Sequence, residues 1–172
     1  MITYLRKKID LKLILILAGF YCITLTISFS KAAYFKFNDI SYKTISWGNL
    51  ILNHFIVDYF AMMTFIIFAA IATKMMMDKK LKLPSIIAIH FLLSLSIGFF
   101  IYFSSILFFV LIGRFSLSQI NISMHLNGIV ESLDINFLLY FIMVLIIYTY
   151  YFIKKNQEVE NEKTLISAQL SR

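Results

Sequence analysis

Two histidines and one aspartate lie within long apolar stretches of the sequence, where ionisable side chains are rare and are by default functional candidates. His54 and Asp58 are four positions apart, so on a helix they share one face and can hydrogen-bond to each other. Such a pair can sense protons or cations, or it can be a structural pair near the outer membrane interface. His90 lies alone in another apolar stretch. We expect it to bond to a neighbouring backbone or side-chain group rather than to a metal.

A metal site made from His54, His125, Glu131 and Asp134 is conceivable by residue type, but their spacing does not require one. The sequence has no phosphate-binding glycine run, no H-E-x-x-H, no nucleophile elbow and no paired cysteines. We therefore assign no catalytic, cofactor-binding or metal-binding residue. The single cysteine, Cys22, also excludes a disulfide scaffold.

The elements that must position these residues are helices that cross a membrane. The chain has 172 residues, of which 60% are hydrophobic and 15% are charged, whereas a soluble domain is about 45–50% apolar and about 25% charged. A spanning helix needs about 20 mainly apolar residues. Four stretches approach this length, namely 13–30, 50–73, 84–110 and 135–153. The sequence thus predicts an all-α integral membrane four-helix bundle over residues 1–153.

The basic residues predict the orientation of the bundle, because cytoplasmic segments carry the excess of Lys and Arg. The segment before the first span, the loop between the second and third spans, and the tail hold 12 of the 16 basic residues. With four spans these three segments lie on one side. We expect both termini in the cytoplasm and the chain in the inner membrane of the cell. The net charge of +7 then reflects topology and contact with the lipid bilayer, and no nucleic-acid partner is expected.

The tail, residues 154–172, is rich in good helix formers and contains neither Gly nor Pro. No turn residues separate it from the fourth span, so we expect one continuous helix that leaves the membrane as a cytoplasmic signalling helix. Val159, Ile166 and Leu170 approximate the start of a coiled-coil seam.

This junction resembles sensor histidine kinases of the LytS/YehU-like group, in which a Tyr-rich span ends in basic residues and continues as a charged helix. The matching positions are Tyr148, Tyr150, Tyr151, Lys154, Lys155, Glu158, Glu160, Glu162, Leu165, Ala168, Gln169 and Leu170. The Lys-rich loop, Pro84 and the run from His90 to Leu93 are also similar to that group. The resemblance covers residues 74–172, and residues 1–73 only in hydropathy.

The resemblance implies a homodimeric sensor region that ends before the phosphoacceptor and ATP-binding domains. ATP and Mg would belong to those domains and not to this chain, and the implied partner is a response regulator with a LytTR-type domain. No residue of this chain matches the kinase motif.

Two alternatives to this function remain. One is a self-contained four-span protein without a kinase, such as a transporter accessory subunit or an assembly factor. The other is a membrane-embedded enzyme using Asp58 and His90, which the predicted spans place toward opposite membrane faces.

Overall fold

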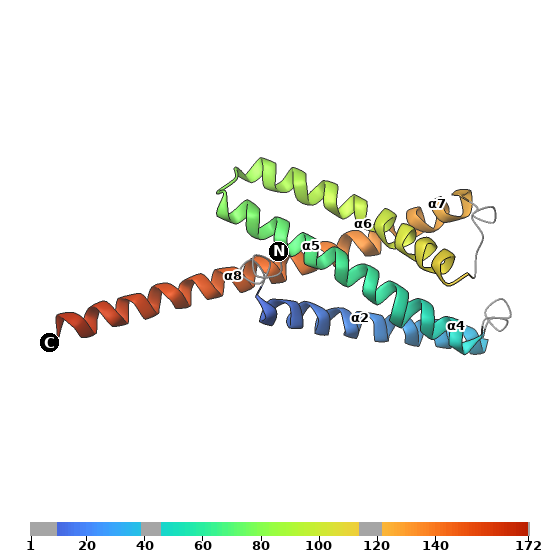
Figure 1. Cartoon of the computed structure of the whole chain (residues 1–172), viewed down its shortest axis with the longest axis horizontal. Helices are drawn as coiled ribbons and strands as arrows, with labels where there is room; N and C mark the ends of the chain where they lie inside the picture. Colours follow the sequence, from blue (N-terminus) through green and yellow to red (C-terminus); the bar gives the residue numbers. More distant parts are fainter. Residues whose placement is uncertain (1–9, 39–45, 114–121, 172) are drawn as a thin grey trace.

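The computed structural model describes residues 10–38, 46–113 and 122–171, with the backbone only for residues 53, 54 and 122–125. These residues form helices and turns, with no strand among them. Four long helical segments carry the fold: α2 (Leu11–Asn38), the segment ending in α5 (Tyr59–Asp78), α6 (Leu83–Leu111) and α8 (Leu133–Leu170) (Figure 1). Each is long and apolar enough to cross a membrane.

The second long segment is not a uniform α-helix. It begins with α4 (Trp47–Ile51), continues as a π-helix, η1 (Leu52–Asp58), and becomes α-helical again in α5. Ser46 caps its start, accepting a hydrogen bond from the backbone N–H of Asn49. All four long segments extend past the stretches expected from apolar composition, and α2 continues as far as Asn38.

A short turn between α5 and α6 makes these two helices antiparallel. The turn between α5 and α6 contains Lys80 in the left-handed region, with a φ of 49°, and Pro84 lies in the first turn of α6, where its missing N–H costs nothing. Gly113, with a φ of 71°, follows α6 and permits the left-handed geometry that ends many helices. A short helix, α7 (Ile122–Glu131), then packs against α6 and α8.

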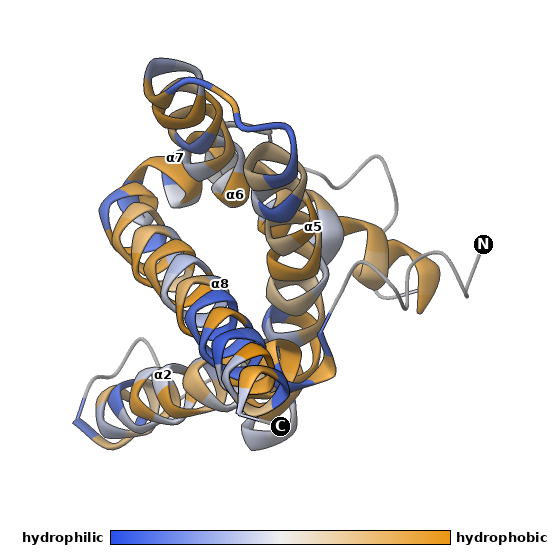
Figure 2. Ribbon diagram, turned by 90° about the vertical axis from the view of Figure 1, so that its left-hand side faces the viewer, coloured by the Kyte–Doolittle hydropathy of each residue, from blue (hydrophilic) through white to orange (hydrophobic). Residues whose placement is uncertain are grey.

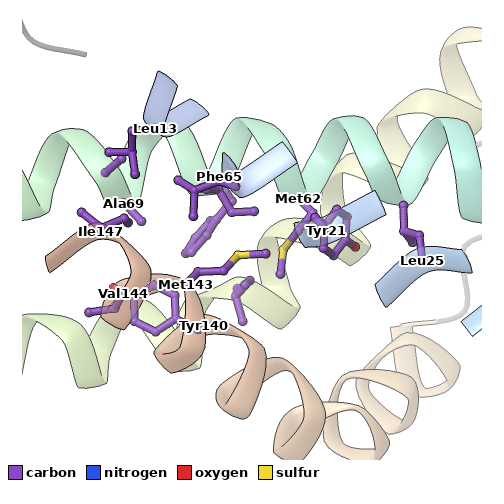
Figure 3. Packing of buried hydrophobic residues seen from close by; sticks show 14 residues of the cluster. Leu13, Tyr21, Leu25, Met62, Phe65, Ala69, Tyr140, Met143, Val144 and Ile147 are labelled. Atoms are coloured by element: carbon purple, nitrogen blue, oxygen red, sulfur yellow. The ribbon is translucent and has the colours of Figure 1, made fainter. Parts of the chain in front are cut away.

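The core lies where α8 meets α2, α5 and α6. Residues at helical spacing line the seam (Figure 3), among them Leu13, Leu17, Tyr21 and Leu25 of α2, Met62, Phe65 and Ala69 of α5, and Tyr140, Met143, Val144 and Ile147 of α8. The outward faces are also apolar, as the hydropathy colouring indicates (Figure 2). Helices that are apolar all round are typical of membrane spans.

The two ends of the bundle differ in their residues. The tail end is where α8 leaves the bundle, and it contains Asp10, the turn between α5 and α6, and Lys154. The far end contains η1, α7 and the start of α8. Beyond Ile153, α8 runs on as a single exposed helix to Leu170 (Figure 1).

Candidate functional site

His90 is buried in the core of the tail end, with 3% of its surface exposed. Its Nδ1 lies 2.8 Å from the hydroxyl oxygen of Tyr140, and its Nε2 lies 3.2 Å from that of Tyr148. Both tyrosines belong to α8 and are eight positions apart, which is two turns plus about 80°, so they lie about two turns apart within one broad face of the helix. The imidazole is therefore held between two turns of the neighbouring helix.

The chemistry of a neutral imidazole suits this arrangement. One ring nitrogen donates a hydrogen bond and the other accepts one, so one tyrosine is acceptor and the other is donor. Both ring nitrogens thus have partners on a neighbouring helix, and His90 needs no metal to satisfy them. Because an axial shift or a rotation of α8 would carry Tyr140 and Tyr148 away together, His90 fixes the position of α8 relative to α6.

A second polar contact joins the residue just before α2 to α8. The Lys154 ammonium donates to the Asp10 carboxylate across 2.8 Å, and the Tyr150 hydroxyl also donates to that carboxylate. The hydrogen bonds from Lys154 and then from Tyr150 lower the pKa of Asp10 to about 2. Asp10 therefore stays ionised at physiological pH, and the contact is charge-assisted.

A third contact comes from α5. The Lys74 ammonium lies 5.9 Å from the centre of the Tyr151 ring, within the range of a cation–π interaction. Together, Asp10, Lys74 and His90 contact α8 over residues 140–154. We call these contacts the α8 clamp, because they hold α8 from three sides: from the residue just before α2, from the end of α5 and from the first half of α6.

The far end has its own polar group around α7. The Tyr102 hydroxyl hydrogen-bonds to Ser132, and the Asn136 amide donates to the same serine hydroxyl across 3.1 Å. Gly128 lets Tyr102 approach, since a Cβ built at that position would overlap the Tyr102 hydroxyl oxygen. This group connects α6 with α7 and the start of α8.

The predicted pair of His54 and Asp58 falls in η1, where the backbone is π-helical rather than α-helical. The His54 side chain lies outside the described residues, so their hydrogen bond stays a prediction. Asp58 is partly buried and ends the π-helix. The structure places Asp58 at the far end and His90 at the tail end, and it does not bring them together.

The metal ligands considered from the sequence are only partly described. Among side chains that the structure describes, no three His, Cys, Asp or Glu residues form a group able to hold a metal. Glu131 and Asp134 are described, whereas the side chains of His54 and His125 lie outside. Asp134 instead accepts a hydrogen bond from the backbone N–H of Ile135.

The tail residues singled out in the sequence are exposed. Val159, Ile166 and Leu170 expose 41%, 51% and 83% of their surfaces. Large apolar side chains at these exposures leave an apolar face on a helix that is otherwise polar.

Comparisons of the chain with protein-family models, curated proteins and solved structures found no match.

Sequence reasoning missed two residues of the clamp, Tyr140 and Asp10. Tyr140 was not singled out, although its spacing of eight from Tyr148 places two phenols on one face of α8. Asp10 was also missed, and its signal was that it is the single acidic residue among Arg6, Lys7, Lys8 and Lys12.

Proposed function

We propose that the chain is the membrane sensory and signal-transmitting module of a two-component sensor histidine kinase. One observation carries the proposal: α8 runs without interruption from the buried core at Tyr140 to the exposed tail at Leu170. A single rigid element therefore connects the packing of the bundle to a helix outside it. The resemblance of residues 74–172 to LytS/YehU-like kinases supports the same function.

The α8 clamp supplies the two-state element that such a module requires. A stimulus at the far end or in the bilayer would change the packing of α2, α5 and α6, and the clamp would pass the change to α8. Breaking the bonds from His90 to Tyr140 and Tyr148 would free α8 to shift or rotate. The module itself performs no chemistry. Phosphotransfer with ATP and Mg belongs to the kinase domains that the resemblance implies.

The orientation follows from charge. With the tail end in the cytoplasm of a cell's inner membrane, the basic residues of the tail and of the turn between α5 and α6 face anionic lipid headgroups. The exposed face of Val159, Ile166 and Leu170 then pairs with the same face of a second copy, which makes the module a homodimer. A response regulator with a LytTR-type domain receives the phosphoryl group.

An insertion series in the complete gene product tests the proposal. One or two alanines inserted between Lys155 and Val159 rotate the following helix by about 100° or 200°, whereas seven restore its phase to within about 20°. Membranes containing each variant are incubated with labelled ATP. We expect autophosphorylation to change several-fold with one or two alanines and to stay near the wild-type level with seven.

The insertion of seven alanines is the matched control for added length. Two results would overturn the proposal. One is wild-type membranes in which the gene product acquires no phosphoryl group from ATP. The other is equal autophosphorylation in all three insertion variants, which would mean that the rotational position of the helix does not control the kinase.

A further inference from the structure

A cavity of about 350 Å³ lies between η1 and α5 on one side and α6 on the other, at the far end of the bundle. Val57 and Ala61 are part of its wall and are almost completely buried, with 5% and 6% of their surfaces exposed. Ile56 and Phe60 also line it but are 40% and 66% exposed. The cavity is therefore a groove that opens to the outside of the bundle between these two exposed side chains.

The wall contributed by α6 is also uncharged, with Phe100 and Phe108 as its large side chains. Two hydroxyl groups line the groove, those of Thr64 and Ser104. The Thr64 hydroxyl donates to the backbone carbonyl of Phe60 across 2.8 Å, so its proton is already used within the helix. None of the residues that line the groove carries a charge, and an occupant gains by apolar contact.

The local backbone explains why there is room here. The groove spans the point where the π-helix returns to the α-helix, with Ile56 and Val57 in η1, and Phe60 and Ala61 in α5. A π-helical turn is wider than an α-helical one, and such turns are frequent at functional sites. Ala61 is the smallest of the lining side chains and leaves room in the floor of the groove.

We propose that this groove binds the hydrocarbon chain of a membrane lipid. The helices that form it are long and apolar enough to cross a membrane, so the medium at its opening is lipid hydrocarbon. Its volume is at the lower end of the range of about 300–1,000 Å³ for ligand pockets, which suits a chain and not a whole lipid. The proposal rests on the membrane placement of the helices and is independent of the kinase function.

Photolabelling of the full chain in lipid nanodiscs tests the site. The probe is a phosphatidylcholine with a diazirine on one acyl chain, and labelled peptides are identified by mass spectrometry. Ile23 is the reference position. It is 64% exposed on α2, and Tyr21 two residues before it stacks on Tyr59, which places Ile23 at nearly the level of Phe60. We expect several-fold more label on the segment around Phe60 than on that around Ile23.

Substitutions that fill the groove sharpen the test. Ala61→Phe should remove the excess label at Phe60, and Ile23→Phe, the matched control, should retain it. Thr64→Phe fills the groove from its exposed side and serves if Ala61→Phe does not fold. Equal labelling of both segments would mean ordinary contact with bulk lipid and would overturn the site. Label that survives both Ala61→Phe and Thr64→Phe would do the same.

Discussion

The tail end and the far end of the bundle are held together by different interactions. At the tail end the buried polar side chains Thr73, His90 and Ser94 lie within the core, and the α8 clamp joins α8 to three other helices. At the far end, α2 meets the second long segment through aromatic rings, with Phe29 contacting Trp47 and Phe55 at 6.5 and 5.0 Å between ring centres. The far end also contains the π-helix and the groove.

This difference separates two mechanical properties. Hydrogen bonds are directional and define one position of α8, whereas the aromatic rings at the far end make tilted and edge-on contacts without a donor and an acceptor to align. The α8 clamp therefore defines the position of α8 at the tail end, whereas the contact of α2 with the second long segment at the far end has no such directional bonds among the described residues. The proposed signal-transmitting function would use the directional contacts of the tail end to hold α8 in one position until a stimulus changes the packing of the bundle.

The largest effect is expected from removing the centre of the clamp. His90→Leu leaves the hydroxyls of the buried Tyr140 and the half-buried Tyr148 without their partner, and we expect it to lower the free energy of unfolding by about 2–4 kcal/mol. Unfolding in mixed detergent micelles measures this. Tyr148→Phe removes one bond only and should cost about 1 kcal/mol or less. If His90→Leu unfolds no more easily than Tyr148→Phe, the two bonds do not hold the tail end.

The next largest loss of stability is expected from a substitution at the far end. Gly128→Ala places a Cβ against the Tyr102 hydroxyl oxygen, and the overpacking should cost about 1–3 kcal/mol. Gly19→Ala is the control, because nothing lies within 4 Å of its added Cβ and alanine favours the helix by about 1 kcal/mol. Thermal unfolding should order the proteins, from most to least stable, as Gly19→Ala, wild type, Gly128→Ala. A Gly128→Ala variant as stable as wild type would contradict the close approach of Tyr102.

A smaller loss of stability is expected when the charge of Asp10 is removed from the clamp, and this loss should depend on pH. The pKa of Asp10 is lowered to about 2 from 3.8, so its stabilisation is fully present above the unfolded value and is lost as pH falls through the folded one. Asp10→Asn should reduce stability by no more than about 1 kcal/mol, since the pair is partly exposed. Unfolding measured for both proteins should give a constant difference from about pH 8 to about pH 5 that shrinks below about pH 4. A difference that changes over the upper part of this range would contradict the assignment.

The smallest change in the free energy of unfolding is expected from a substitution in the tail, outside both ends of the bundle. Leu165→Ala lies in the exposed tail and should change the free energy of unfolding of the bundle by less than about 0.5 kcal/mol. Phe65→Ala, in the core, is its comparison and should cost several-fold more. A Leu165→Ala variant that destabilises the bundle would mean that the tail packs back against it.

The sequence predicted the fold class and the number of long apolar helices, because both follow from composition and run length. The stretch 84–110 agrees closely with α6, which Pro84 and Gly113 delimit. The second segment was less predictable. Nothing in its residue pattern marks the change to a π-helix at Leu52, and the spacing of His54 and Asp58 was interpreted on α-helical geometry.

The candidate site was predictable only in part. His90 stood out because a lone imidazole in an apolar helix needs partners. The identity of those partners depends on how α8 packs against α6, since Tyr140 and Tyr148 are 50 and 58 residues away. The same holds for Asp10 and Lys154, 144 residues apart. Local patterns predict which residues need partners, and only the assembled bundle determines which residues meet that need.

The length of α8 has a geometric consequence. From Lys154 to Leu170 the exposed part of the helix extends about 24 Å beyond the clamp. It therefore acts as a lever arm whose pivot is the ion pair of Asp10 and Lys154. A tilt of about 5° at the pivot displaces Leu170 by about 2 Å, which is as large as the helix shifts that switch many protein interfaces. A tilt of α8 that is too small to disturb the packing of the core therefore displaces Leu170, at the end of the helix, far enough to change a contact made there.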